Sequence, residues 1–191
     1  MFIQTEATPN PSTLKFLPGR TIIDSGTIDF RNLDDAKGKS PLAERLFDVS
    51  GVDGVFFGHD FVTITKKDDP DWQHLKPAIL GAIMEHFMND APVMTSDVDA
   101  GHATGSGQEF FDEADSGIVD TIKELLETRI RPAVAQDGGD ITFRGFKQGI
   151  VYLEMRGACA GCPSSTATLQ HGIQNLLKHF IPEVESVEAV T

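Results

Sequence analysis

The sequence has few cysteines, little basic charge and no long apolar run. Two cysteines three residues apart in a chain of 191 residues do not make the disulfide framework of a small secreted domain, which favours a reducing compartment. No apolar run approaches the ~20 residues that a membrane-spanning helix needs, so we expect no membrane segment. The start of the chain carries neither a basic leader region nor an Arg-rich amphipathic presequence, and we therefore expect a cytoplasmic protein.

Acidic charge dominates but is unevenly distributed. The net charge of −13 argues against nucleic acid as a partner. Over half of this charge lies in residues 89–116, which contain no Lys or Arg, whereas residues 117–191 are close to neutral. The same stretch is rich in Asp, Gly, Ser and Ala and has no helical or alternating period, which predicts a flexible acidic linker. The alternative is a docking segment built on Phe110 and Phe111, a pair that could equally pack as a helix staple.

Residues 1–88 are predicted to form a small ββαββα domain. Short strands are expected in "MFIQTEA" and "TLKFLP", where prolines confine them to edges or ends. Ser40 is a suitable N-cap and Pro41 a suitable first residue for the helix that follows. The segments "VDGVFF" and "FVTITK" flank the turn residues Gly58-His59-Asp60 as a β-hairpin, and a longer helix begins near Asp71. The expected core stripe of that helix consists of Trp72, Leu75, Ile79, Ile83 and Phe87.

Residues 117–191 are predicted to form an αββαβ domain, which makes the whole chain α+β with two small domains and a linker. An amphipathic helix is expected to end at Pro132 or at the Gly138-Gly139 pair. Two alternating strands, "DITFRGF" and "GIVYLEM", are joined through Lys147-Gln148-Gly149. A second helix runs from about Pro163 to Phe180, and "VESVEAV" forms the last strand. The inward residues of the second helix are expected to be Leu169, Ile173, Leu176, Leu177 and Phe180.

Both cysteines lie in "GACAGCPSST", between a strand end and a helix start. Pro163 suits the first helical position and leaves Cys162 at or next to the N-cap. The unpaired backbone N–H groups and the helix dipole at this place favour thiolate over thiol, which lowers a cysteine pKa. The small residues around the sulfurs would let a large partner approach closely. Arg156 could add positive charge beside an anionic centre, but we favour its interpretation as a solvated strand end.

Four interpretations of the cysteine pair compete. In the first interpretation both cysteines are inert small residues, but packing alone explains poorly why the only two cysteines cluster in a glycine-rich loop. A zinc site within one chain would need two more ligands, yet His171 and His179 are eight residues apart on one helix, roughly 12 Å along its axis, and are better interpreted as surface residues. His74 and His86 are likewise interpreted as helix-surface residues. A thioredoxin-like dithiol, with Cys159 attacking and Cys162 resolving, fits the loop but not the wider element pattern.

The fourth interpretation is an iron–sulfur cluster completed by a second copy of the chain. Cubane 4Fe-4S clusters are commonly held by four cysteine thiolates, and two such loops facing each other across a twofold axis supply four. The near-neutral cysteine domain favours this arrangement, because two weakly charged units repel little.

The sequence also resembles a known family. The run from "LLETRIRPAVAQDGGD" through "CAGCPSS" to "VESVEAV" strongly resembles the C-terminal domain of NifU, and the whole chain resembles the Nfu-type iron–sulfur scaffold and carrier proteins of bacteria and mitochondria. The segment "IQTEATPNPSTLKF" resembles the extra N-terminal domain of that family.

The resemblance implies a protein that is not an enzyme and that binds a 4Fe-4S cluster at Cys159 and Cys162 of two subunits. Such a protein would be a homodimer when loaded, would receive the cluster from an upstream donor and would hand it to apo-proteins. Its location would be the bacterial cytoplasm, or the mitochondrial matrix for a processed eukaryotic form. Asp137 and Asp140 could support the cluster ligands, although a helix stop and turn is the favoured interpretation. For the N-terminal domain we expect client docking, with folding or dimerisation as the alternative.

Overall fold

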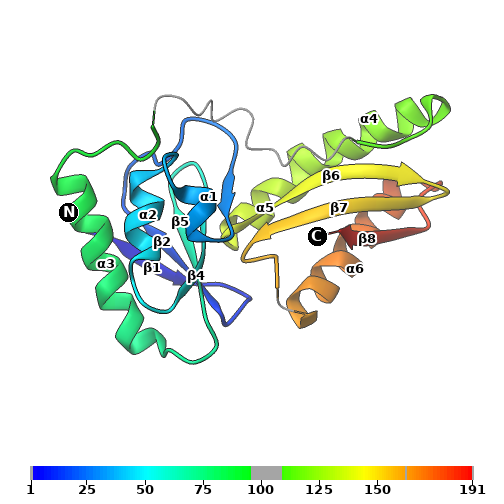
Figure 1. Ribbon diagram of the computed structural model, residues 1–191. Helices are drawn as coiled ribbons and strands as arrows, with labels where there is room; N and C mark the ends of the chain where they lie inside the picture. The colour runs from blue at the N-terminus through cyan, green and yellow to red at the C-terminus, as the bar shows by residue number, and fades with distance from the viewer. Residues whose placement is uncertain (1, 96–108, 162, 191) are drawn as a thin grey trace. The chain divides into compact units, whose positions relative to one another are not determined.

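The computed structural model describes residues 2–95, 109–161 and 163–190. The chain divides into two compact units, Met1–Gly105 and Ser106–Thr191. Each unit combines a β-sheet with helices, so the fold class is α+β, as predicted (Figure 1). No helix within the described ranges is both long and apolar enough to span a bilayer.

The first unit is built on a five-stranded antiparallel sheet with the order β1-β2-β5-β4-β3. The predicted strands are present, and the turn between β4 and β5 contains the exposed His59, as expected. Strand β3 was not predicted, because three residues are too few to show an alternating pattern. The strands are β1 (Gln4–Ala7), β2 (Thr13–Leu17), β3 (Ile28–Phe30), β4 (Val52–Phe57) and β5 (Val62–Lys66).

Helices α2 (Pro41–Phe47) and α3 (Trp72–Met88) lie side by side in the first unit (Figure 1). Ser40 caps α2 as predicted, since its Oγ accepts a hydrogen bond from the backbone N–H of Ala43 at 3.0 Å. The predicted stripe of α3 faces the core, where Leu75, Ile79, Ile83 and Phe87 are buried and Trp72 is half-buried. A further short helix, α1 (Leu33–Ala36), is capped by Asn32 and was not predicted.

The second unit starts with a nearly continuous helical run that continues past Pro132. The run consists of a 3-10 turn η1 (Glu113–Asp115), α4 (Ser116–Leu125), a π-helical segment η2 (Leu126–Ile130) and α5 (Arg131–Gln136). Pro132 has no N–H to bond to the preceding turn, and it lies in the first turn of α5, directly after the wider π turn. The helix therefore ends before Gly138, whose φ of +81° needs a glycine, and not at Pro132.

The rest of the second unit follows the predicted order of elements. Strands β6 (Gly139–Lys147) and β7 (Ile150–Gly157) are antiparallel and are joined through Gln148 and Gly149, both with positive φ. Helix α6 (Pro163–Phe180) then leads to β8 (Ser186–Val190), which pairs parallel to β7 (Figure 1). Ile173 and Leu177 of α6 are buried as expected, but Phe180 is 46% exposed, so its assignment to the core was wrong.

The described ends of the predicted linker contact their own units. In the first unit, Ser40 Oγ donates to the carbonyl oxygen of Val93 at 2.6 Å, and the backbone N–H of Thr95 donates to the carbonyl oxygen of Lys39 at 2.8 Å. In the second unit, the ring of Phe110 packs against Tyr152, with 5.1 Å between the ring centroids. Residues 96–108 lie outside the described residues, and the extent of the linker stays a prediction.

Candidate functional site

The turn that carries Cys159 links the end of β7 to the start of α6. Gly157 and Gly161, with φ of +62° and +82°, bracket the cysteine, and α6 begins at Pro163 as predicted. The second predicted ligand, Cys162, lies outside the described residues. The geometry of the site is therefore built from Cys159 and its neighbours.

Cys159 is buried, which the small residues around it did not suggest. Its side chain is only 6% exposed and belongs to the hydrophobic core of the second unit. The sulfur lies over Gly139 at the start of β6, where an added Cβ would be 2.6 Å from Sγ and 2.7 Å from the carbonyl oxygen of Arg156. A side chain at position 139 would therefore displace the cysteine, and the close approach of the two segments requires glycine.

The environment of Cys159 favours the neutral thiol. Burial, followed by the negative charges of Asp137 and Asp140, raises its pKa to about 12. The expectation that the helix start would lower the pKa is thus wrong for Cys159. The physical reason is that this sulfur packs into the core beside two carboxylates, where loss of hydration outweighs the helix dipole.

Backbone and side-chain hydrogen bonds hold the cysteine turn in place. The N–H of Ala158 donates to the carbonyl oxygen of Gly138 at 3.2 Å, and the N–H of Cys159 donates to that of Arg156 at 3.4 Å. From the first part of α6, Oγ1 of Thr166 donates to the carbonyl oxygen of Cys159 at 3.1 Å. The turn is thereby attached both to the Gly138-Gly139 segment and to the helix.

Asp140 is a buried ion-pair residue and not a turn residue. It is 3% exposed, and its two carboxylate oxygens accept hydrogen bonds from Nε and Nη2 of Arg131, each at 2.8 Å. Oδ1 of Asp140 also accepts the backbone N–H of Ile141 at 2.8 Å. The turn interpretation of Asp140 was therefore wrong, whereas Asp137 is exposed at the end of α5, as a helix stop requires.

Arg131 was missed by the sequence reasoning. Its Nη1 also donates to Glu127 four residues earlier, at 2.5 Å. An acidic and a basic residue four positions apart on a predicted helix indicate an ion pair, so the sequence could have predicted the contact of Arg131 with Glu127. The sequence could not indicate the pairing of Arg131 with Asp140 on β6.

Arg156 is also buried, so its interpretation as a solvated strand end was wrong. The residue is 4% exposed, and its Nη2 donates to Oε2 of Glu154 at 3.2 Å. Arg144 pairs with the same carboxylate oxygen. Burial alone would raise the pKa of Glu154, but the hydrogen bonds from Arg156 and Arg144 lower it. Arg156 thus forms part of a charge cluster on the sheet.

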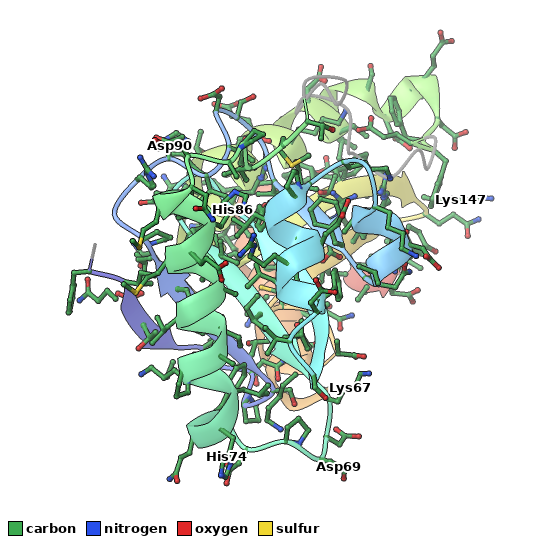
Figure 2. All side chains as sticks on the ribbon, turned by 60° about the vertical axis from the view of Figure 1, so that its left-hand side comes forward. Lys67, Asp69, His74, His86, Asp90 and Lys147 are labelled. Carbon is green, nitrogen blue, oxygen red and sulfur yellow. The ribbon has the colours of Figure 1, made fainter. Side chains whose placement is uncertain are left out.

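None of the five histidines that the structure describes groups with Cys159 as a metal site. Four of the predicted surface or turn positions are exposed: His59, His74, His171 and His179. His86, also expected on the surface, is only 1% exposed, and within the described residues its Nε2 has no hydrogen-bond partner. Figure 2 shows His86 on α3 and His74 near the other end of the same helix. Among the residues that the structure describes, no three His, Cys, Asp or Glu side chains group as a metal site.

Comparisons with known proteins match both units. Residues 3–90 match the family model for the scaffold protein Nfu/NifU N terminal, and residues 122–188 match the NifU-like domain. The chain is 50% identical to the human protein "NFU1 iron-sulfur cluster scaffold homolog, mitochondrial" over 191 residues, which are 100% of this chain and 72% of that protein. It is 50% identical over 190 residues to "NifU-like protein 4, mitochondrial" of Arabidopsis thaliana, which are 98% of this chain and 65% of the relative.

A solved structure is also similar. The NMR structure of a NifU-like protein from Saccharomyces cerevisiae matches with 28% identity and a TM-score of 0.46, covering 51% of this chain and 87% of that one. The two family models together cover most of the chain, and the human relative is matched over more than two thirds of its length. The chain therefore belongs to the Nfu family of scaffold proteins, with an Nfu-type N-terminal domain and a NifU-like domain.

Proposed function

We propose that this protein is an iron–sulfur cluster scaffold and carrier. Two copies bind one 4Fe-4S cluster between them through Cys159 and Cys162, and the cluster is cargo that is later passed on to apo-proteins. The proposal is supported by the relatives that match the full chain, since the human one is named an iron–sulfur cluster scaffold homologue. Relatives named mitochondrial support a mitochondrial matrix location over the bacterial cytoplasm.

The observation that carries the proposal is the incomplete set of ligands in one chain. The sequence holds only two cysteines, and among the described residues no three His, Cys, Asp or Glu side chains group as a metal site. Thiolate is the usual ligand of iron–sulfur clusters, which take four of them in a cubane. A twofold dimer supplies four thiolates from two identical loops.

Cluster transfer would then be an exchange of ligands. An incoming client thiolate replaces one cysteine of the dimer at an iron atom, and repetition of this step moves the cluster without net redox change. The protein thus needs clients with free cysteines and an upstream donor, but no catalytic residues of its own. The Nfu-type N-terminal domain is proposed to dock clients, with a role in folding or dimerisation as the alternative.

A thioredoxin-like function fits the described geometry less well. An attacking thiol must be accessible and must form thiolate readily. Cys159, the expected attacking residue, is 6% exposed, and burial raises its pKa to about 12. The thiol is thus poorly suited to attack a substrate disulfide.

Anaerobic reconstitution with iron and sulfide tests the proposal. We expect a broad visible absorption, four iron atoms per dimer and a shift from monomer to dimer on loading. Cys159→Ala and Cys162→Ala should each abolish the shared cluster, whereas Thr121→Val, on an exposed part of α4, should load normally. A strictly monomeric iron-loaded protein, or full loading of either cysteine variant, would overturn the shared site. Disulfide reductase activity at thioredoxin-like rates would favour the dithiol function instead.

A further inference from the structure

The position of Cys159 conflicts with direct binding of a shared cluster. A cluster held between two subunits must contact the sulfur at the subunit surface. In the structure, however, the side chain is 6% exposed and Sγ packs over Gly139 inside the core. The described conformation therefore hides the ligand that the proposed function needs.

We propose that this conformation is a closed resting state, and that the turn of residues 157–161 opens to turn the Cys159 sulfur outward before a cluster can bind. This inference rests on the proposed function and adds a step that controls it. The closed state also shields the thiol from oxidation while no cluster is present.

The backbone of the turn is suited to such a movement. Gly157 and Gly161 stand on either side of the cysteine with positive φ, and glycine passes between conformations that other residues avoid. Around Gly161 there is open space, because a Cβ built there would have no atom within 4 Å. The N–H of Cys159 reaches its acceptor at 3.4 Å, which is long for a hydrogen bond. Opening at Cys159 thus breaks a weak backbone hydrogen bond of the cysteine itself, while the bonds from Ala158 to Gly138 at 3.2 Å and from Ala160 to Gly157 at 3.1 Å are the stronger ones that hold the turn closed.

Thr166 is positioned to act as the latch of the closed state. It lies in the first part of α6, and its hydroxyl donates to the carbonyl oxygen of Cys159 at 3.1 Å. Removal of this one hydrogen bond should favour the open state by about fivefold, the factor that corresponds to a net contribution of ~1 kcal/mol. Thr166→Ser keeps the donor and should keep the latch.

The rate of alkylation of Cys159 in the cluster-free protein tests the closed state. Iodoacetamide is applied under reducing, anaerobic conditions to Cys162→Ala, so that Cys159 is the only thiol, with the urea-unfolded protein as the fully exposed reference. We expect at least ~100-fold slower alkylation in the folded protein, since the thiol is almost completely buried. Adding Thr166→Val should accelerate the reaction about fivefold. Thr166→Ser should react as slowly as the Cys162→Ala parent.

Thr121→Val is the matched control. Like Thr166, Thr121 lies on a helix and donates its hydroxyl to a backbone carbonyl, but its acceptor is Gly117, at 2.9 Å, and not a residue of the cysteine turn. Alkylation of folded Cys162→Ala at the rate of the unfolded chain would overturn the closed state. Equal rates with and without Thr166→Val, or equal acceleration by Thr121→Val, would overturn the latch. Reconstitution of the unmodified chain separates this inference from the proposed function. If Cys159 is protected from alkylation but the chain binds no iron, the proposed function is overturned. If the chain forms an iron-loaded dimer but Cys159 is alkylated as fast as in the unfolded chain, only the closed resting state is overturned.

Discussion

Replacement of Gly139 by alanine probes the contact on which the cysteine turn depends. The added Cβ would lie 2.6 Å from Cys159 Sγ, 2.7 Å from the carbonyl oxygen of Arg156 and 3.0 Å from the backbone nitrogen of Cys159. Two of these three atoms belong to the backbone, so the collision cannot be relieved by rotation of a side chain. The φ of Gly139 is not positive, and alanine therefore meets no conformational penalty there.

The expected loss of stability follows from these distances. Overpacking of a well-filled site costs about 1–3 kcal/mol. Alanine recovers ~0.5–1 kcal/mol by restricting the unfolded chain. The difference is about 0–2.5 kcal/mol, and its upper part applies because two of the three atoms met belong to the backbone. We therefore expect Gly139→Ala to lower the free energy of unfolding of the second unit by about 1–2.5 kcal/mol and to increase alkylation of Cys159.

Urea unfolding of the full chain can resolve the two units. Trp72 and Tyr152 are the only Trp and Tyr, so Trp fluorescence follows the first unit and the Tyr signal follows the second. Gly139→Ala should shift the Tyr transition alone. The control is Gly172→Ala on α6, where an added Cβ has no atom within 4 Å and where alanine should stabilise the helix by ~0.5–1 kcal/mol. A Gly139→Ala protein as stable as the unmodified chain would refute the packing of Cys159 over Gly139.

Three further predictions concern stability. Burial, followed by the charge of Arg45, lowers the pKa of His86 below 6.5. As the pH falls, the imidazole is therefore protonated in the unfolded chain at a higher pH than in the folded one. The first unit should therefore lose stability as the pH falls below about 6.5, and His86→Phe should reduce this dependence in urea titrations followed by Trp72; an unchanged pH profile would argue against the buried imidazole. Asp140→Asn leaves Arg131 without its buried carboxylate and should cost at least ~2 kcal/mol in the Tyr152 transition, whereas an unchanged midpoint would show that the ion pair is not needed. Ser40→Ala removes the cap of α2 and the bond to Val93, and should lower the stability of the first unit by about 1–2 kcal/mol, with no shift of the Tyr152 transition; a Trp72 midpoint equal to that of the unmodified chain would contradict it.

Local signals in the sequence predicted most of the secondary structure. The three and four residue spacing of α3, the cap at Ser40 and the turn at Gln148-Gly149 each depend on residues close in the chain, and the structure has all three. The same holds for the order of elements in the second unit. The exceptions include the three-residue strand β3, which is too short to show a pattern, and the helical run, which continues past Pro132 through a π turn.

The sequence alone predicted a glycine-rich turn that carries the cysteines and leads into a helix, because both features depend on residues that are neighbours in the chain. The burial of Cys159, its raised pKa and the pairing of Asp140 with Arg131 were decided by tertiary structure. The same is true of the buried His86 and Arg156. For Cys159 and Asp140 the deciding neighbour comes from another element, since Gly139 of β6 lies against the sulfur and Arg131 of α5 pairs with the carboxylate. Whether a polar group meets water, a core or an opposite charge depends on which segments pack together, and local spacing does not specify that.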